Sequence, residues 1–182
     1  HSVEVMFTEK ISEKKIIFST QVDDSLPDKL NGDAIRLTQI LINLISNALK
    51  FTEQGSINMY ISNEGIYNGK VKTGITVADT GIGIDTKKLE QIFGRFQQAD
   101  DAVTRKYGGT GLGLSIVNDL VKLQKGTIKV ESKPGKGTSF KIVIPYQISS
   151  TETNENLLNP ASKNNEINLS NVVVLVAEDN KV

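Results

Sequence analysis

The sequence predicts a mixed α/β (α+β) fold, because segments with helical and strand patterns alternate along most of its length. Apolar residues recur at helical spacing over residues 34–51 and 112–124. Three segments rich in β-branched residues, 15–23, 56–64 and 70–79, have the pattern of strands. The chain has 182 residues, which is enough for one domain of ordinary size with a real core.

The N-terminal part is expected to run helix, strand, loop, helix. Residues 3–14 have mixed amphipathic character and are predicted to form the first helix. After the strand at 15–23, the turn-rich segment SLPDKLNGD places Asp33 as the N-cap of a helix that begins at about Ala34. This helix should stop near Gly55, and a turn containing glycine and asparagine should join the next two strands.

The following part contains a helix and a hairpin after a stretch of irregular sequence. TGIGID breaks the strand pattern, and TKKLEQIFGRF begins as a short helix. Residues 97–111 lack periodicity and are expected to form a loop before the helix at 112–124. The segments GTIKVES and GTSFKIVIPY are predicted to form a hairpin around KPGKG.

The composition changes near the C-terminal end and divides the chain into three parts. Residues 1–146 are expected to form one domain. Residues 147–170 are polar, rich in asparagine and without periodicity, which is typical of a linker. Residues 171–182 have the pattern of a buried strand that ends in two acidic residues, although an apolar tail with a polar end has the same pattern.

The composition also argues against several classes of function. Lys+Arg and Asp+Glu number 21 each, a balance that argues against bulk electrostatic capture of nucleic acid or an anionic membrane. The absence of cysteine excludes a disulfide, a thiolate zinc site and a catalytic thiol. The longest apolar run, Val172 to Ala177, is too short to span a bilayer, and no signal peptide is expected. His1 is interpreted as the remnant of an affinity tag.

The helix predicted at 34–51 carries a narrow polar stripe on an otherwise mostly apolar surface. At ~100° per residue, the stripe is roughly 80° wide and consists of Arg36, Gln39, Asn43, Asn47 and Lys50. Amide oxygens suit Mg²⁺, and a nearby lysine suits phosphate. The stripe therefore indicates either a ligand site or a thin solvated face of an ordinary amphipathic helix.

Two glycine-containing motifs follow this helix. In DTGIGID, Asp79 ends a strand, and Gly81 and Gly83 allow close approach of the backbone to a ligand. The carboxylate of Asp79 can accept a hydrogen bond from an exocyclic amine such as that of adenine. A tight strand-to-helix turn is the alternative interpretation.

The second motif, GGTGLGLS at residues 108–115, lies directly before a helix. Backbone N–H groups at a helix N-terminus can bind phosphate, and glycines give access to them. The motif is neither a P-loop nor a complete dinucleotide fingerprint. A flexible hinge between loop and helix is the alternative interpretation.

The order of these motifs resembles that of histidine kinase catalytic domains over residues 3–146. NLISNALKFT is similar to the N box of that family, DTGIGI to the G1 box, IFGRF to the F box and GGTGLGLS to the G2 box. The resemblance implies the Bergerat ATP-binding fold. This fold is a two-layer sandwich in which three helices cover one face of a mixed, mostly antiparallel sheet.

The resemblance also implies roles for individual residues. Asn43, Asn47 and Lys50 are the expected catalytic residues, with Asn47 on Mg²⁺, Asn43 beside it and Lys50 on the phosphates. Phe51 is implied to pack against adenine, and Asp79 to bind its amine directly and through water. The other residues implied to bind or shape the nucleotide site are Ile84, Phe96, Arg105, Lys106, Gly109, Thr110, Gly111, Leu112, Gly113, Gly81 and Gly83.

Residues 97–107 are implied to form the ATP lid, anchored by Phe93 and Phe96 of the F box. For the lid charges Arg105 and Lys106, a nucleotide contact and a plain surface role stay open as alternatives.

One departure from the family pattern lies in this lid. Gln98 stands where many family members carry a basic residue, which weakens any claim of γ-phosphate contact there. Gln-Ala-Asp at 98–100 resembles the version found in hybrid kinases.

The implied function is that of the ATP-binding catalytic domain of a hybrid sensor histidine kinase. Such a domain transfers the γ-phosphoryl group of ATP to a histidine in a two-component phosphorelay and needs Mg²⁺. No histidine of this chain lies in a phosphoacceptor helix, so the phosphoacceptor and dimerisation helices are expected before residue 1. The tail VVVLVAEDN resembles the start of a receiver domain, with Glu178 and Asp179 as its metal-binding acids and the phosphoacceptor aspartate beyond Val182.

The expected partners are therefore the protein's own phosphoacceptor helices and a receiver domain, both outside this chain. No nucleic acid and no direct membrane contact are expected, and the domain is expected in the cytoplasm, whether or not the intact protein is membrane-anchored. The resemblance implies a homodimer for the intact protein, through helices that this chain lacks, and is compatible with a monomeric fragment.

Two other functions stay open. The domain could be a degenerate kinase module that binds nucleotide or docks without transfer, or a serine-directed kinase of the same fold. Related ATPases of this fold place a glutamate at the position of Asn43 to activate water. Because an amide is a poor general base, Asn43 favours a kinase over a hydrolase.

Overall fold

The computed structural model describes residues 2–94 and 111–149, which belong to one compact unit, His1–Ser149. Residues 95–110, with the predicted lid, and residues 150–182, with most of the predicted linker and the receiver-like tail, lie outside the described residues.

The described residues form a mixed, six-stranded sheet. Its strand order is β1-β3-β4-β6-β2, with β5 paired to β6. β1 runs parallel to β3, and every other pair is antiparallel. The strands are β1 (Ile17–Val22), β2 (Leu30–Asn31), β3 (Ser56–Tyr67), β4 (Lys70–Asp79), β5 (Thr127–Lys133) and β6 (Gly137–Ile148).

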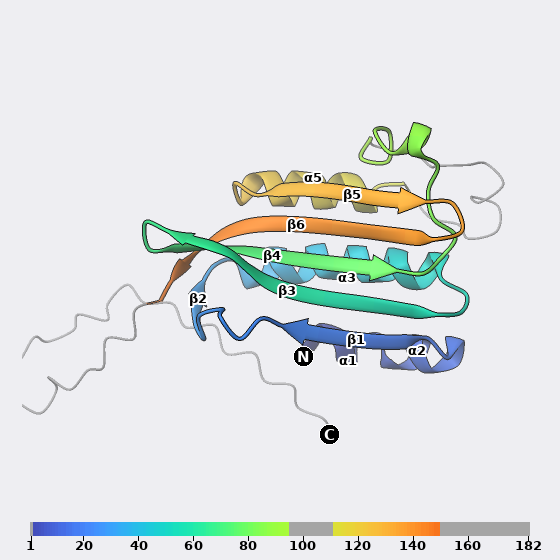
Figure 1. The fold of residues 1–182 in the computed structure, drawn as a ribbon, viewed down its shortest axis with the longest axis horizontal. Helices are drawn as coiled ribbons and strands as arrows, with labels where there is room; N and C mark the ends of the chain where they lie inside the picture. The colour runs from blue at the N-terminus through green and yellow to red at the C-terminus, as the bar shows by residue number, and fades with distance from the viewer. Residues whose placement is uncertain (1, 95–110, 150–182) are drawn as a thin grey trace, which may run out of the picture. The chain divides into compact units, whose positions relative to one another are not determined.

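The helices lie together on one face of this sheet, behind it in Figure 1. They are α1 (Ser2–Val5), α2 (Thr8–Lys14), α3 (Ala34–Phe51) and α5 (Gly113–Leu123), with a 3₁₀ turn, η1 (Thr86–Lys88), after β4. The arrangement confirms the predicted two-layer α/β sandwich with a mixed, mostly antiparallel sheet. No described helix has the length and apolar character needed to cross a membrane.

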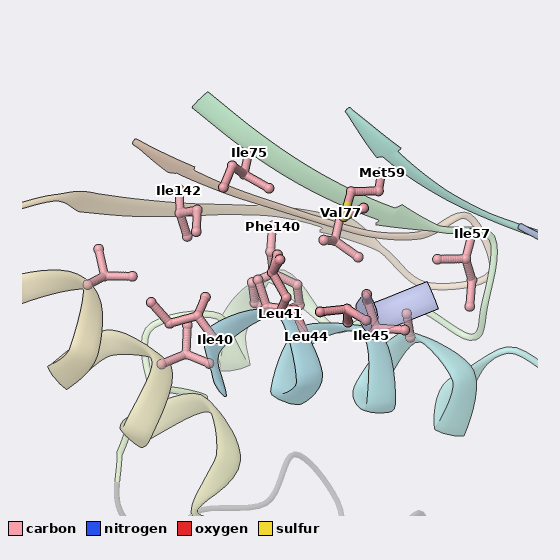
Figure 2. Packing of buried hydrophobic residues seen from close by; sticks show 14 of the residues in the cluster. Ile40, Leu41, Leu44, Ile45, Ile57, Met59, Ile75, Val77, Phe140 and Ile142 are labelled. Atoms are coloured by element: carbon pink, nitrogen blue, oxygen red, sulfur yellow. The ribbon is translucent and has the colours of Figure 1, made fainter. Parts of the chain in front are cut away.

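The core lies between α3 and the sheet. Figure 2 shows α3 side chains directed at side chains of β3, β4 and β6. The α3 residues in this layer are Ile40, Leu41, Leu44 and Ile45, and the sheet residues are Ile57, Met59, Ile75, Val77, Phe140 and Ile142. Burying one such side chain contributes roughly 1.5–3 kcal/mol, so α3 is the main element that holds the sheet's covered face.

The start and end of α3 agree with the prediction. Asp33 caps the helix: its Oδ1 accepts a hydrogen bond from the Arg36 N–H at 3.0 Å, and its Oδ2 lies 3.1 Å from Arg36 Nε. The helix ends at Phe51, and Thr52 leaves in an extended conformation. Ile35 is one of the apolar residues outside the polar stripe of the predicted helix. It is nevertheless 82% exposed, because it lies in the first turn, before the helix reaches the core.

The N-terminal helix predicted at 3–14 is divided in two. A turn at Met6 and Phe7 separates α1 from α2. Val3 and Phe7 are buried in the core, whereas Val5 and Met6 are exposed. Valine and phenylalanine are weaker helix formers than alanine or leucine, so core packing rather than helix propensity sets the path of this segment.

Three further differences concern the presence or the length of an element, which the local sequence patterns do not predict. The two-residue strand β2 lies in the predicted loop SLPDKLNGD and pairs with the end of β6. β3 continues to Tyr67 through an irregularity in register between Asn63 and Ile66. The short helix predicted from residue 86 is only the 3₁₀ turn η1, which begins where Asp85 Oδ1 accepts from the Lys87 N–H at 2.9 Å.

Candidate functional site

Three segments named in the sequence analysis meet at one end of the sheet. These are the last turns of α3, the loop that follows β4 and the start of α5, all at the right in Figure 1. β4 ends at Asp79, α3 ends at Phe51 and α5 begins at Gly113. The fold thus brings together residues that are far apart in the sequence.

The polar stripe of α3 faces the start of α5. Asn43 and Asn47 are half-buried, and Asn43 Nδ2 donates to the Gln39 carbonyl at 2.9 Å. An ideal Cβ at Gly113 would lie 3.0 Å from Asn43 Oδ1 and 3.9 Å from Asn47 Nδ2. A glycine at this position therefore allows the N-terminus of α5 to approach both amides closely.

Lys50 and Phe51 form the end of the helix. Lys50 Nζ lies 4.8 Å from the centroid of the Phe51 ring, within the range of a cation–π contact. Partial burial lowers the pKa of Lys50. An ammonium group that has lost part of its hydration is suited to pair with an anion, because less water must be displaced.

Asp79 is a half-buried carboxylate, and one of its two oxygens already accepts hydrogen bonds from the backbone. Its Oδ1 accepts from the Gly81 N–H at 2.9 Å and from the Thr138 N–H at 3.3 Å. Burial raises the pKa of Asp79, and these two N–H groups act in the opposite direction. Oδ2 accepts no hydrogen bond from the described residues, so it can accept one from a ligand.

The loop after Asp79 is packed against the end of α3 by backbone contacts. The Ile82 N–H donates to the Phe51 carbonyl at 3.1 Å. A Cβ at Gly81 would lie 2.3 Å from the same carbonyl oxygen. A glycine at position 81 is therefore required for the loop and the helix to come this close.

The turn between β5 and β6 holds the other side of this loop. The Gly135 N–H donates to the Ile82 carbonyl, and the Ile84 N–H donates to Ser132 Oγ, each at 2.7 Å. Gly83 has φ +71°, and a Cβ there would lie 2.1 Å from the Lys133 carbonyl oxygen. Ile84 packs against the core, so its contribution to the site is through its backbone and its burial.

Ser132 and Thr138 were not among the residues expected at the site. Ser132 Oγ lies 2.9 Å from the Gly137 carbonyl oxygen and 2.9 Å from Thr138 Oγ1, and Thr138 N–H reaches Asp79. The only sequence signal was the predicted hairpin around KPGKG. Without the register that pairs Asp79 with Thr138, that signal does not place them.

The start of α5 is built as a helix N-terminus behind a glycine. Gly111 has φ +69°, Leu112 stands at the N-cap position, and Ser115 Oγ donates to the Leu112 carbonyl at 2.9 Å.

Of the F box, Phe93 packs edge-on against Phe140 with ring centroids 6.5 Å apart. The other expected residues, Phe96, Arg105, Lys106, Gly109 and Thr110, lie outside the described residues.

This arrangement offers three kinds of recognition within one site. A carboxylate oxygen is available for an amine, a lysine and a helix N-terminus for phosphate, and two amides for a hard cation. The described residues contain no group of three His, Cys, Asp or Glu side chains that could hold a metal ion.

Comparison with known proteins identifies similar sequences and folds. The family model described as "Histidine kinase-, DNA gyrase B-, and HSP90-like ATPase" matches residues 32–148. The chain is 42% identical over 169 residues to "Autoinducer 2 sensor kinase/phosphatase LuxQ" of Vibrio vulnificus, covering 92% of this chain and 20% of that protein. It is 39% identical over 128 residues to "Signal transduction histidine-protein kinase BarA" of Escherichia coli, covering 70% and 14%.

Two solved structures have the same fold. The full-length ShkA structure in complex with AMPPNP matches with a TM-score of 0.69 at 33% identity, covering 81% of this chain and 29% of that chain. The nucleotide-free catalytic domain of the histidine kinase ThkA matches with a TM-score of 0.63 at 32% identity, covering 80% and 89%. The chain thus spans only a fifth or less of the two relatives named above but most of an isolated catalytic domain.

The contacts around Gly83 predict that Gly83→Ala destabilises the fold more than Gly135→Ala. Both glycines have φ +71°, but a Cβ at Gly135 meets nothing within 4 Å. We expect a loss of about 1 kcal/mol for Gly135→Ala from backbone strain and about 3 kcal/mol for Gly83→Ala from strain plus the clash. Urea unfolding measures both values, and equal losses would contradict the proposed contact with Lys133.

The buried carboxylate predicts a pH-dependent stability difference between wild type and Asp79→Asn. Because burial raises the pKa of Asp79 above 3.8 in the folded state, the folded protein holds the proton more tightly. Wild type should therefore lose stability as pH rises from about 3.8 through the folded pKa, and the variant should not.

Urea unfolding of both proteins from about pH 4 to about pH 8 measures this difference. The exposed Asp28→Asn serves as the control. If the stability of Asp79→Asn minus that of wild type does not increase with pH, the charge of Asp79 is not destabilising.

Proposed function

Because the chain belongs to the family of histidine kinase-, DNA gyrase B- and HSP90-like ATPases, we propose that it is the ATP-binding catalytic domain of a hybrid sensor histidine kinase. In this proposal the γ-phosphoryl group of ATP is transferred to a histidine outside this chain. The observation that carries it is that three elements meet at one end of the sheet: β4, which ends at Asp79, the last turn of α3 and the start of α5 at Gly113.

The base of the nucleotide is proposed to bind at Asp79. Its Oδ2 is available for the exocyclic amine of adenine, while Oδ1 is held by the N–H groups of Gly81 and Thr138. Guanine presents a carbonyl oxygen at the equivalent position, which a carboxylate oxygen repels. The site therefore favours adenine, and the ring of Phe51, at the end of α3, is proposed to pack against it.

The phosphates are proposed to lie between Lys50 and the start of α5. Backbone N–H groups at a helix N-terminus and an ammonium group both stabilise phosphate. Mg²⁺ fits the neutral amide oxygens of this site, with Asn47 as its protein ligand and Asn43 beside it. When bound, Mg²⁺ supplies charge neutralisation during phosphoryl transfer.

Transfer rather than hydrolysis is favoured by the amide at position 43. Asn43 has no usable proton affinity near neutral pH, so it cannot act as a general base toward water. The site therefore leaves the nucleophile to be supplied by another group, and phosphoryl transfer depends mainly on positioning and charge neutralisation.

The partners are proposed from the relatives' names. LuxQ and BarA are called sensor and signal transduction kinases, and the chain spans a small part of each. We place the phosphoacceptor and dimerisation helices before residue 1 and a receiver domain after the linker, with the domain in the cytoplasm. A degenerate nucleotide-binding module and a serine-directed kinase are the competing functions.

The proposal predicts Mg²⁺-dependent ATP binding that is lost in Asp79→Asn and Asn47→Ala. The first variant removes the carboxylate that binds the adenine amine, and the second removes the amide ligand of Mg²⁺. Calorimetric titration measures both dissociation constants. Ser46→Ala, on the exposed side of the same helix, and Asp28→Asn should bind like wild type.

A second experiment separates the competing functions. A fragment carrying a histidine kinase dimerisation and phosphoacceptor helix pair is added with radiolabelled ATP, and acid-labile phosphate on it supports the kinase. ATP binding without label on that fragment would leave a binding module, and label that resists acid would indicate transfer to serine.

A further inference from the structure

The side chain of Lys14 joins the N-terminal helical segment to the end of α3. Lys14 is the last residue of α2 and is half-buried. Its Nζ donates to the Leu49 carbonyl at 2.5 Å and to the Thr52 carbonyl at 3.1 Å. These are long-range contacts, because the partners lie 35 and 38 residues further along the chain.

The carbonyls that Lys14 binds lie at the C-terminal end of α3, where the helix itself supplies no hydrogen-bond donors for the last carbonyls. The last carbonyls of a helix have no N–H partner within the helix, and a cation near them is also favoured by the helix dipole. The Phe51 carbonyl is taken by the Ile82 N–H. Lys14 and the loop after Asp79 thus hold the same helix end from two sides.

That helix end carries two of the residues proposed to bind ATP. Lys50 and Phe51 lie between the two carbonyls that Lys14 binds, and Lys50 Nζ is 4.8 Å from the Phe51 ring centroid. If the last turn frays, the backbone positions of Lys50 and Phe51 are no longer fixed, and neither are their side chains. Fraying is the usual state of a helix end whose carbonyls lack fixed partners.

The segment that supplies Lys14 is itself fixed to the core. Val3 in α1 and Phe7 in the turn between α1 and α2 are buried, at 8% and 6% exposure. Phe7 thus anchors the start of α2 and Lys14 anchors its end.

We propose that Lys14 is a positioning residue for ATP binding, which holds the last turn of α3 so that Lys50 and Phe51 are placed for the nucleotide. The inference rests on the proposed function. It adds a residue from the N-terminal segment that makes no contact with the nucleotide itself.

The test compares ATP dissociation constants of Lys14→Met, Lys14→Arg and wild type by calorimetry with Mg²⁺. Methionine keeps the apolar stem and removes both hydrogen bonds, so we expect binding to weaken about tenfold. Arginine can donate to both carbonyls and should restore affinity to within about twofold of wild type. Lys10→Met, an exposed lysine one turn earlier in α2, is the matched control and should bind like wild type.

The outcomes separate this inference from the proposed function. Wild type that binds ATP, with Lys14→Met equally tight, overturns the role of Lys14 and leaves the proposed function in place. Lys14→Arg as weak as Lys14→Met also overturns it, because the two hydrogen bonds are then not the cause. Absence of binding in wild type overturns the proposed function, and this inference with it.

Thermal unfolding without nucleotide is measured for each variant, so that affinities are compared on folded protein only. If Lys14→Met does not fold, Lys14→Gln takes its place. Glutamine is shorter than lysine and uncharged, so its hydrogen bonds to the carbonyls are weaker, and an affinity between that of wild type and a loss of about tenfold is then expected.

Discussion

The packing of α3 on the sheet is the constraint on which the rest of the molecule depends. Ile40, Leu44 and Ile45 are almost completely buried, and their spacing fixes the rotation of the helix about its axis. Once that rotation is fixed, the polar stripe with Asn43 and Asn47 must lie at the edge of the core, facing α5. The packing of α3 on the sheet therefore fixes both the arrangement of the two layers and the direction in which the amides point.

The proposed site is assembled by backbone contacts around that helix rather than by side chains alone. The carbonyl of Phe51 receives the Ile82 N–H, and the absence of a side chain at Gly81 lets the loop come this close. The loop directly follows Asp79 at the end of β4, and burial raises the pKa of this partly buried carboxyl group. A site that keeps such a carboxylate gives up some stability for a function that needs the charge.

The sequence patterns predicted those helices and strands whose ends are determined by residues close together in the sequence. The apolar spacing and the Asp33 cap gave α3 from Ala34 to Phe51, and the strand pattern gave β4 to its end at Asp79. Contacts between distant segments were not predictable. The two-residue strand β2, the approach of Ser132 and Thr138 to Asp79, and the reach of Lys14 to α3 all depend on the sheet register and helix packing.

The identity of residue 43 connects this geometry with the chemistry. Its amide nitrogen already donates to the Gln39 carbonyl, and its oxygen faces Gly113. A carboxylate at the same place would repel the Gln39 carbonyl oxygen and turn toward the N–H groups of α5, where a base could act on water. An amide instead donates to the helix backbone and stays uncharged beside the proposed phosphate site. In the proposed function, the site binds ATP without hydrolysing it and leaves the γ-phosphoryl group for a nucleophile that another domain supplies.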